Sequence, residues 1–145
     1  MMELEVIYPD NQHHPKMLHN KTGKFECGFL GVSIEDNNAI MLQNMAGSQL
    51  GIWLAHGEGK FEIKGKESDY NIPVKYRHDQ LPGNPNGSDF SAAALASGDG
   101  RHLAIMPHLE RSLFPWNWGH YADKTVHEVS PWMIPFANAF KWLKK

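Results

Sequence analysis

The sequence predicts an α/β fold in which several short strands are followed by a C-terminal amphipathic helix. Short apolar runs bounded by turn-forming residues, such as 52–55 and 103–106, are typical of buried strands. The dipeptide Asp99-Gly100 separates two apolar runs, 90–96 and 103–106, and favours a tight turn that joins them into a hairpin. Near the end of the chain, Ser130-Pro131 supplies an N-cap residue and a first helical residue.

The other strands follow from alternation and turn chemistry. Residues 25–34 alternate well enough to form a strand. We expect residues 39–42 to pair with them as a hairpin across the turn Asp36-Asn37-Asn38. Two further extended segments are expected at 61–63 and 74–76.

The terminal helix is expected to begin at Pro131 and to pack on the sheet. Its apolar residues recur at helical spacing, so they share one face of the helix. That face carries Trp132, Phe136, Ala139, Phe140 and Leu143.

The predicted organisation is one domain, residues 25–145, preceded by a polar arm or linker, residues 1–24. A length of 145 residues suits a single domain with a sizeable core. Residues 1–24 are polar and are interrupted by Pro9, Pro15 and Gly23, so this segment cannot bury much surface by itself.

Charge and composition exclude several classes of partner. The formal net charge is −2 and the charged residues are interspersed, so we expect no binding to nucleic acid or to an anionic membrane. No apolar run approaches the length of about 18 residues that a membrane span needs. The single cysteine excludes an internal disulfide and fits a soluble protein of the reducing cytoplasm. The nine histidines contain no closely spaced ligand set, so no metal site is predicted.

His108 and Glu110 are the candidate catalytic residues. They follow the apolar run 103–106 and Pro107, and residues two apart on an extended segment point to the same side. A carboxylate that binds one ring nitrogen of a histidine fixes its tautomer, while the other nitrogen can take a proton from a nucleophile. A surface ion pair in a polar loop is the competing interpretation.

For the other reactive or aromatic side chains, the sequence alone favours structural roles. Cys27 is the only thiol, but the apolar run follows it rather than precedes it, so it fits a strand residue and not a nucleophile elbow. His56 and Glu58 share the spacing of the first pair within His-Gly-Glu-Gly, and a capped β-turn is favoured over direct catalysis. The late tryptophans, from Trp116 onward, fit core packing better than a stacking platform.

Several motifs together resemble a known family. Residues 106–111, Met-Pro-His-Leu-Glu-Arg, resemble the MPHPER signature of class I glutamine amidotransferases, with Leu109 where the wider group commonly has proline. Further stretches narrow the resemblance to the glutaminase domain of the formylglycinamidine ribonucleotide synthase family, and they occur in that family's order. These stretches are residues 25–29, 45–50, 56–61, 84–88 and 130–133.

The resemblance implies an incomplete flavodoxin-like domain: its strand-rich C-terminal portion with a terminal amphipathic helix. In this family the catalytic cysteine lies on an upstream glycine-rich elbow, and no such motif precedes Phe25, so the nucleophile is expected outside this chain. His108 would deprotonate that cysteine during glutamine hydrolysis, and Glu110 would orient His108. His56 and Glu58 would belong to a supporting or substrate loop.

The resemblance also implies partners. The parent enzyme would use the released ammonia, with ATP and magnesium bound in a separate synthase domain, to convert formylglycinamide ribonucleotide to its amidine in purine biosynthesis. This chain would hold no cofactor and would be inactive alone, with glutamine and the remainder of the parent polypeptide as its partners. Missing strands would leave exposed sheet edges that favour self-association. Two alternatives stay open: a free-standing ligand-binding module on the same fold, and one half of a split amidotransferase.

Overall fold

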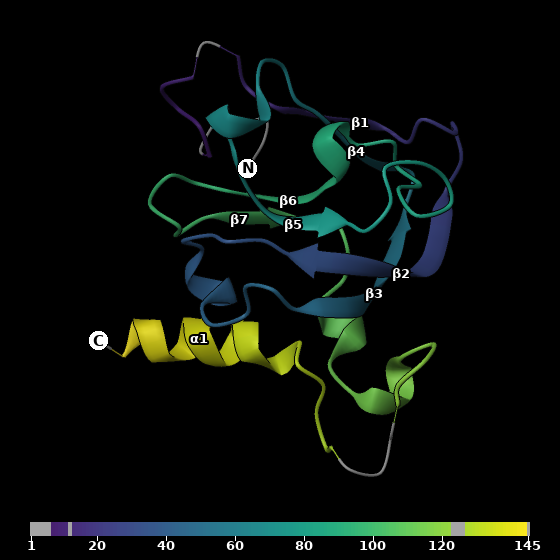
Figure 1. Ribbon diagram of the computed structural model, residues 1–145, viewed down its shortest axis with the longest axis vertical. Helices are drawn as coiled ribbons and strands as arrows, with labels where there is room; N and C mark the ends of the chain where they lie inside the picture. Colours follow the sequence, from purple (N-terminus) through teal and green to yellow (C-terminus); the bar gives the residue numbers. More distant parts are fainter. Residues whose placement is uncertain (1–6, 12, 123–126, 145) are drawn as a thin grey trace.

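The computed structural model describes residues 7–11, 13–122 and 127–144, which form a strand-rich unit with an α-helix at its C-terminal end (Figure 1). Its strands are β1 (Lys16–His19), β2 (Glu26–Ile34), β3 (Gln49–His56), β4 (Glu58–Glu62), β5 (Asn71–Tyr76), β6 (Ala92–Ala96) and β7 (Leu103–Ile105), and its helix is α1 (Met133–Leu143). Short 3-10 turns are η1 (Ile40–Leu42), η2 (Glu67–Asp69), η3 (Asp89–Ser91), η4 (Glu110–Ser112) and η5 (Pro115–Asn117). Among the described residues, no helix combines the length and the apolar character needed to cross a bilayer.

Five strands form a curled sheet in the order β3-β2-β5-β6-β7, and β1 and β4 pair separately. The predicted α/β character, strands followed by a terminal helix, is confirmed. Neighbouring strands in these described parts of the chain pair antiparallel. The parallel strands of a flavodoxin-like domain are therefore not part of this sheet, and that finer arrangement stays a prediction.

The N-terminal segment packs against the rest of the chain. Strand β1 pairs with β4, so Met17 lies opposite Phe61. Ile7 and Tyr8 are buried in the same apolar cluster as Phe61. The Tyr8 hydroxyl accepts a hydrogen bond from the Asn71 amide at 2.9 Å, and burial raises the pKa of Tyr8 to about 12. Parts of residues 1–24 thus contribute to the core.

Two apolar clusters lie on either side of strand β6. All five residues of β6 are fully buried, and four of them are alanines, so neighbouring elements approach this strand closely on both faces. One cluster joins the sheet to η1 and Trp132; its largest members include Ile34, Leu42, Met45, Ile52, Leu54 and Trp132. The other joins β4, β5 and the N-terminal segment; it includes Ile7, Tyr8, Phe61, Ile63, Ile72 and Leu95. Tertiary packing thus makes β6 a strand although its alanines favour a helix by propensity.

The predicted strand at 39–42 is wrong. Residues Ile40–Leu42 form the 3-10 turn η1, and β2 pairs with β3 and β5 instead. The Asn37 side chain accepts a hydrogen bond from the Ala39 amide at 2.9 Å, which starts a turn before a strand can form. Asn44 then adopts a positive φ of 64° and returns the chain toward β3.

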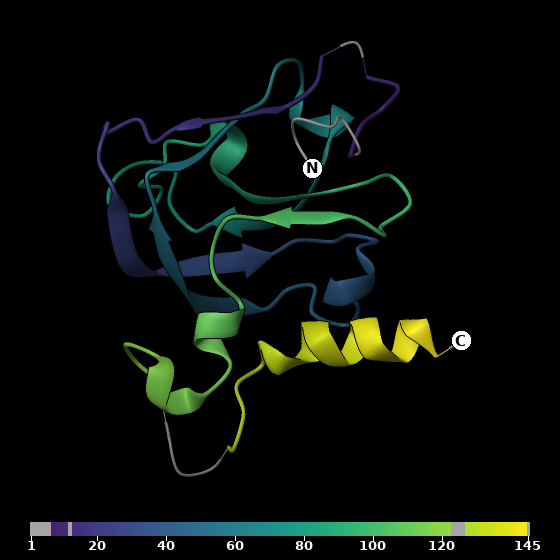
Figure 2. The same cartoon turned by 180° about the vertical axis from the view of Figure 1, so that it is seen from behind.

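The terminal helix forms, but its predicted orientation is wrong. It begins at Met133 rather than Pro131, and Phe136, Phe140 and Leu143 are 40%, 59% and 75% exposed instead of packed on the sheet. Polar contacts of another side of the helix set its orientation. The Asn138 side chain donates to the Met41 and Gln43 carbonyls at 3.0 and 2.9 Å. Pro135, three residues earlier on the same side of the helix, is buried. Helix α1 therefore lies along η1, as Figure 2 shows from behind.

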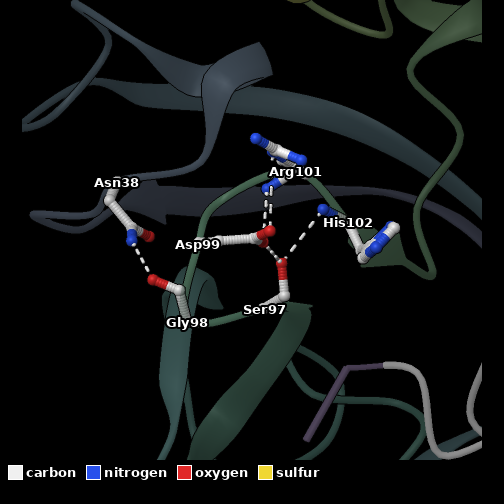
Figure 3. A network of polar contacts seen from close by, with 6 residues as sticks. All are labelled: Asn38, Ser97, Gly98, Asp99, Arg101 and His102. Atoms are coloured by element: carbon white, nitrogen blue, oxygen red, sulfur yellow. Dashed lines mark hydrogen bonds and ion pairs between the residues drawn. The ribbon is translucent and has the colours of Figure 1, made fainter.

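The predicted hairpin of β6 and β7 is confirmed, and a polar network holds its turn (Figure 3). The Ser97 hydroxyl donates to the Asp99 carboxylate at 2.6 Å, and the Arg101 amide donates to the same carboxylate at 3.1 Å. These two hydrogen bonds, in that order, lower the pKa of Asp99. The Asn38 side chain donates to the Gly98 carbonyl at 2.6 Å, so the hairpin turn is also fixed to the segment that leads into η1.

Replacement of Gly100 by alanine should destabilise the fold. Gly100 has a φ of 72°, and an added Cβ would lie 2.1 Å from the backbone oxygen of Asn38. We expect Gly100→Ala to lower the free energy of unfolding by about 2 kcal/mol or more, measured by urea denaturation. Gly98→Ala is the matched control, because nothing lies within 4 Å of its added Cβ. Equal stability of the two variants would contradict this account of the turn.

Candidate active site

The candidate site begins where the chain leaves β7 and crosses to the edge of β3. The His108 amide donates to the Trp53 carbonyl at 2.7 Å and forms an isolated antiparallel bridge. His108 is the third residue after Ile105 at the end of β7, a span of at most about 11 Å. Strands β3 and β7 are the two edges of the five-stranded sheet, so the sheet curls until these edges approach each other.

The buried side chain of Ser112 connects the loop that carries His108 to β3. Its side chain is fully buried; the hydroxyl accepts from the Trp53 amide and donates to the His108 carbonyl, both at 3.2 Å. The Ser112 carbonyl accepts from Trp118 Nε1 at 2.7 Å and from the Ser130 hydroxyl at 2.6 Å. Ser112 therefore connects the loop that carries His108 both to β3 and to the segment that leads into α1.

The structure brings His108 and Glu110 together. His108 Nδ1 lies 2.7 Å from Glu110 Oε1, and the two side chains are 26% and 59% exposed. The pair forms across a turn rather than along an extended segment, because Leu109 has a helical backbone conformation and its side chain is buried. An ionised carboxylate can only accept, so the neutral tautomer of His108 that satisfies this contact carries its proton on Nδ1 and leaves a lone pair on Nε2. This arrangement is that of a base and its orienting carboxylate.

A pocket of about 440 Å³ opens beside this pair. His56, His108 and Glu110 provide its polar groups, and its apolar lining includes Met41, Ile105, Met106, Leu109 and Phe136. Strand β3 ends at His56, whose ring centre lies 6.4 Å from that of His108. Both ring nitrogens of His56 are buried without a hydrogen-bond partner among the described residues. Burial first, and then the charge of His108, lower the pKa of His56.

The other candidates lie outside this pocket. Glu58 points to solvent beside His19, with its Oε1 3.5 Å from His19 Nδ1, and does not line the cavity of His56. Cys27 is an exposed residue of β2, as its sequence context predicts, and lines a different cavity with Leu81. Nowhere in the described ranges do three or more His, Cys, Asp or Glu side chains gather as metal ligands would.

Sequence reasoning did not identify Ser112, Trp53 or the apolar walls of the pocket. Ser112 and Trp53 are 59 residues apart and meet only through the curl of the sheet. No local pattern marks such a contact, since a buried serine has the same sequence context as an exposed one.

Comparison with known proteins identifies the class to which this fold and site belong. Residues 1–143 match the model of the CobB/CobQ-like glutamine amidotransferase domain. The chain therefore belongs to this family of glutamine amidotransferase domains.

The individual relatives are named more specifically. The chain is 42% identical over 146 residues to the probable phosphoribosylformylglycinamidine synthase, chloroplastic/mitochondrial, of Arabidopsis thaliana, and 37% identical over 150 residues to phosphoribosylformylglycinamidine synthase of Homo sapiens. These matches cover 90% and 92% of this chain, but only 10% and 11% of the relatives. The chain thus spans about a tenth of the length of these relatives.

A solved structure, that of PurLQS from Thermotoga maritima, has a similar fold. The TM-score is 0.69 with 22% sequence identity, and the match covers 96% of this chain and 57% of that chain. At this identity the likeness supports the fold rather than the chemistry. The amidotransferase fold expected from the sequence motifs is confirmed at this coarser level.

Replacement of Ser112 by alanine should loosen the candidate site. The substitution removes the acceptor of the Trp53 amide and the donor to the His108 carbonyl. We expect the free energy of unfolding in urea to fall by about 1–3 kcal/mol, the usual penalty for buried polar groups that lose their partners. The matched control is Ser68→Ala, at an exposed serine of η2, which should change stability by less than about 0.5 kcal/mol. A neutral Ser112→Ala variant would show that this hydroxyl does not hold the loop.

Proposed function

We propose that this chain supplies the general base and its orienting carboxylate for the glutaminase reaction of a phosphoribosylformylglycinamidine synthase. The observation that supports the proposal most directly is the 2.7 Å contact between His108 Nδ1 and Glu110 Oε1 beside a pocket, in a chain of the glutamine amidotransferase family. His108 is the base, and Glu110 holds its tautomer and stabilises the imidazolium that forms.

The proposed reaction proceeds through a thioester. His108 Nε2 takes the proton of a cysteine thiol, and the thiolate attacks the side-chain carboxamide carbon of glutamine. The C–N bond breaks, and the proton on His108 passes to the leaving nitrogen, which departs as ammonia. His108 then deprotonates a water molecule that attacks the thioester, so glutamate leaves and the thiol is restored. Cys27 lines another cavity, so the reacting thiol belongs to polypeptide outside these 145 residues.

The parent protein of this proposal is the whole synthase. Its synthase domain, with bound ATP and magnesium, uses the ammonia to convert formylglycinamide ribonucleotide to the amidine in the cytoplasm. Residues 25–145 form the C-terminal portion of a flavodoxin-like amidotransferase domain, and residues 1–24 lead into it. The names of the synthase relatives support the choice of parent enzyme, and their coverage supports a chain that is one portion of a larger polypeptide. His56, which shares the pocket with His108, is the residue of the His56–Glu58 loop that belongs to the site.

The rates of synthesis with glutamine and with added ammonium test whether His108 acts in the glutaminase step. In the parent synthase, His108→Gln should lower kcat with glutamine by about 100-fold or more, because general-base catalysis contributes about 10²–10⁴-fold. Synthesis from added ammonium should stay unchanged, since ammonia bypasses the glutaminase step. His120→Gln, at an exposed histidine outside the pocket, is the matched control and should alter neither rate.

The isolated chain provides a second arm of the test. Incubated with glutamine, it should release no glutamate above the uncatalysed rate, because it lacks the nucleophile. Glutaminase turnover by the isolated chain at the rate of the parent, or full glutamine-dependent activity of the His108→Gln parent, would refute the proposal. A free-standing binding module predicts instead that glutamine-dependent synthesis is insensitive to His108.

A further inference from the structure

We propose that the uncovered apolar face of α1 is the surface on which the nucleophile-bearing part of the amidotransferase domain packs. We call Phe136, Phe140 and Leu143 the α1 face. The inference rests on the proposed function, because it concerns the polypeptide that brings the thiol to His108. It adds where that polypeptide binds on this chain and which residues hold it.

The α1 face is apolar, and no element among the described residues covers it. Its three residues are 40%, 59% and 75% exposed, and their spacing of four and three places them on one side of the helix. The adjacent side is already used, because Asn138 binds the carbonyls of η1 and Pro135 is buried. A row of large apolar side chains left in water beside a packed helix side indicates an interaction surface.

The α1 face is continuous with the candidate active site. Phe136, at its first turn, lines the same pocket as His108. Glu110 is hydrogen-bonded to Nδ1 of His108, so a thiol has to approach Nε2 within hydrogen-bond reach, which is about 2.6–3.2 Å. A polypeptide that delivers this thiol enters the pocket against Phe136, and the next two turns of α1 extend its contact surface to Phe140 and Leu143.

The comparisons show that proteins of this family have additional polypeptide. The matched PurLQS chain extends beyond the part that this chain covers, which is 57% of it. Lys144 borders the α1 face at its C-terminal end, where its Nζ lies 4.4 Å from the centre of the Phe140 ring. The occupant is therefore an apolar segment whose polar rim carries carboxylates, because opposite charges across an interface favour binding and like charges oppose it.

Photo-crosslinking in the intact parent synthase tests the location. We replace Phe140 with p-benzoylphenylalanine, a photoreactive aromatic of similar shape, and identify the crosslinked peptide by mass spectrometry. The expected product joins position 140 to the part of the amidotransferase domain that carries the catalytic cysteine. The matched control places the same photoreactive residue at Lys141, which is exposed and lies about 100° around the helix, and should not give that product. A crosslink to the synthase domain or to a second copy of the chain, or no crosslink, would overturn the proposal.

Activity gives an independent readout. In the parent, Phe140→Asp should lower glutamine-dependent synthesis at least tenfold and leave ammonium-dependent synthesis unchanged, whereas Lys141→Asp should alter neither rate. Unchanged glutamine-dependent synthesis in the Phe140→Asp parent would contradict the docking surface.

Failure of the docking proposal and failure of the proposed function are distinguishable. The photo-crosslink should persist in a parent that also carries His108→Gln, because that substitution removes the base but not the surface. If the crosslink forms as expected and His108→Gln keeps full glutamine-dependent activity, the docking surface holds and the catalytic assignment is wrong. If His108→Gln is inactive with glutamine and the crosslink joins another region, the catalytic assignment holds and the docking surface is wrong.

Discussion

The hydrogen bond from the His108 amide to the Trp53 carbonyl joins the two edges of the curled sheet, and the position of the candidate site depends on it. This bond sets the position of the chain that leaves β7 relative to β3, which carries His56 at its end. The Ser112 hydroxyl bridges the same two residues from the other side. One backbone bridge and one buried serine thus place two imidazole rings in a single pocket.

The geometry of His108 is established before any nucleophile is present. Glu110 fixes the ring through Nδ1, and the loop between them is short and held by a buried Leu109. Preorganisation of this kind lowers the free energy needed to orient the base during reaction. The pocket is otherwise lined mainly by apolar side chains, and burial lowers the pKa of His56, which disfavours a charge on that ring.

Local signals in the sequence predicted the parts of the molecule that depend on local chemistry. Asp99-Gly100 identified the β6–β7 hairpin, and the spacing of His108 and Glu110 identified a pair that the structure places in contact. The strand predicted at 39–42 failed because a short apolar run does not reveal the Asn37 side-chain bond that begins a turn. The orientation of α1 failed because polar contacts of Asn138, and not its apolar face, hold the helix to η1. The bridge between Trp53 and His108 depends on the curl of the whole sheet, which no local window contains.

The tautomer of His108 tests the central claim most directly, because a base that serves a nucleophile has to present an unprotonated Nε2. Nitrogen-15 NMR of the histidine side chains reports which ring nitrogen carries the proton in the neutral form. We expect the proton of His108 on Nδ1, and we expect the Nδ1 signal to shift when Glu110 is replaced in Glu110→Gln. A neutral His108 protonated on Nε2, or an Nδ1 signal indifferent to Glu110→Gln, would contradict the assignment of this pair as base and orienter.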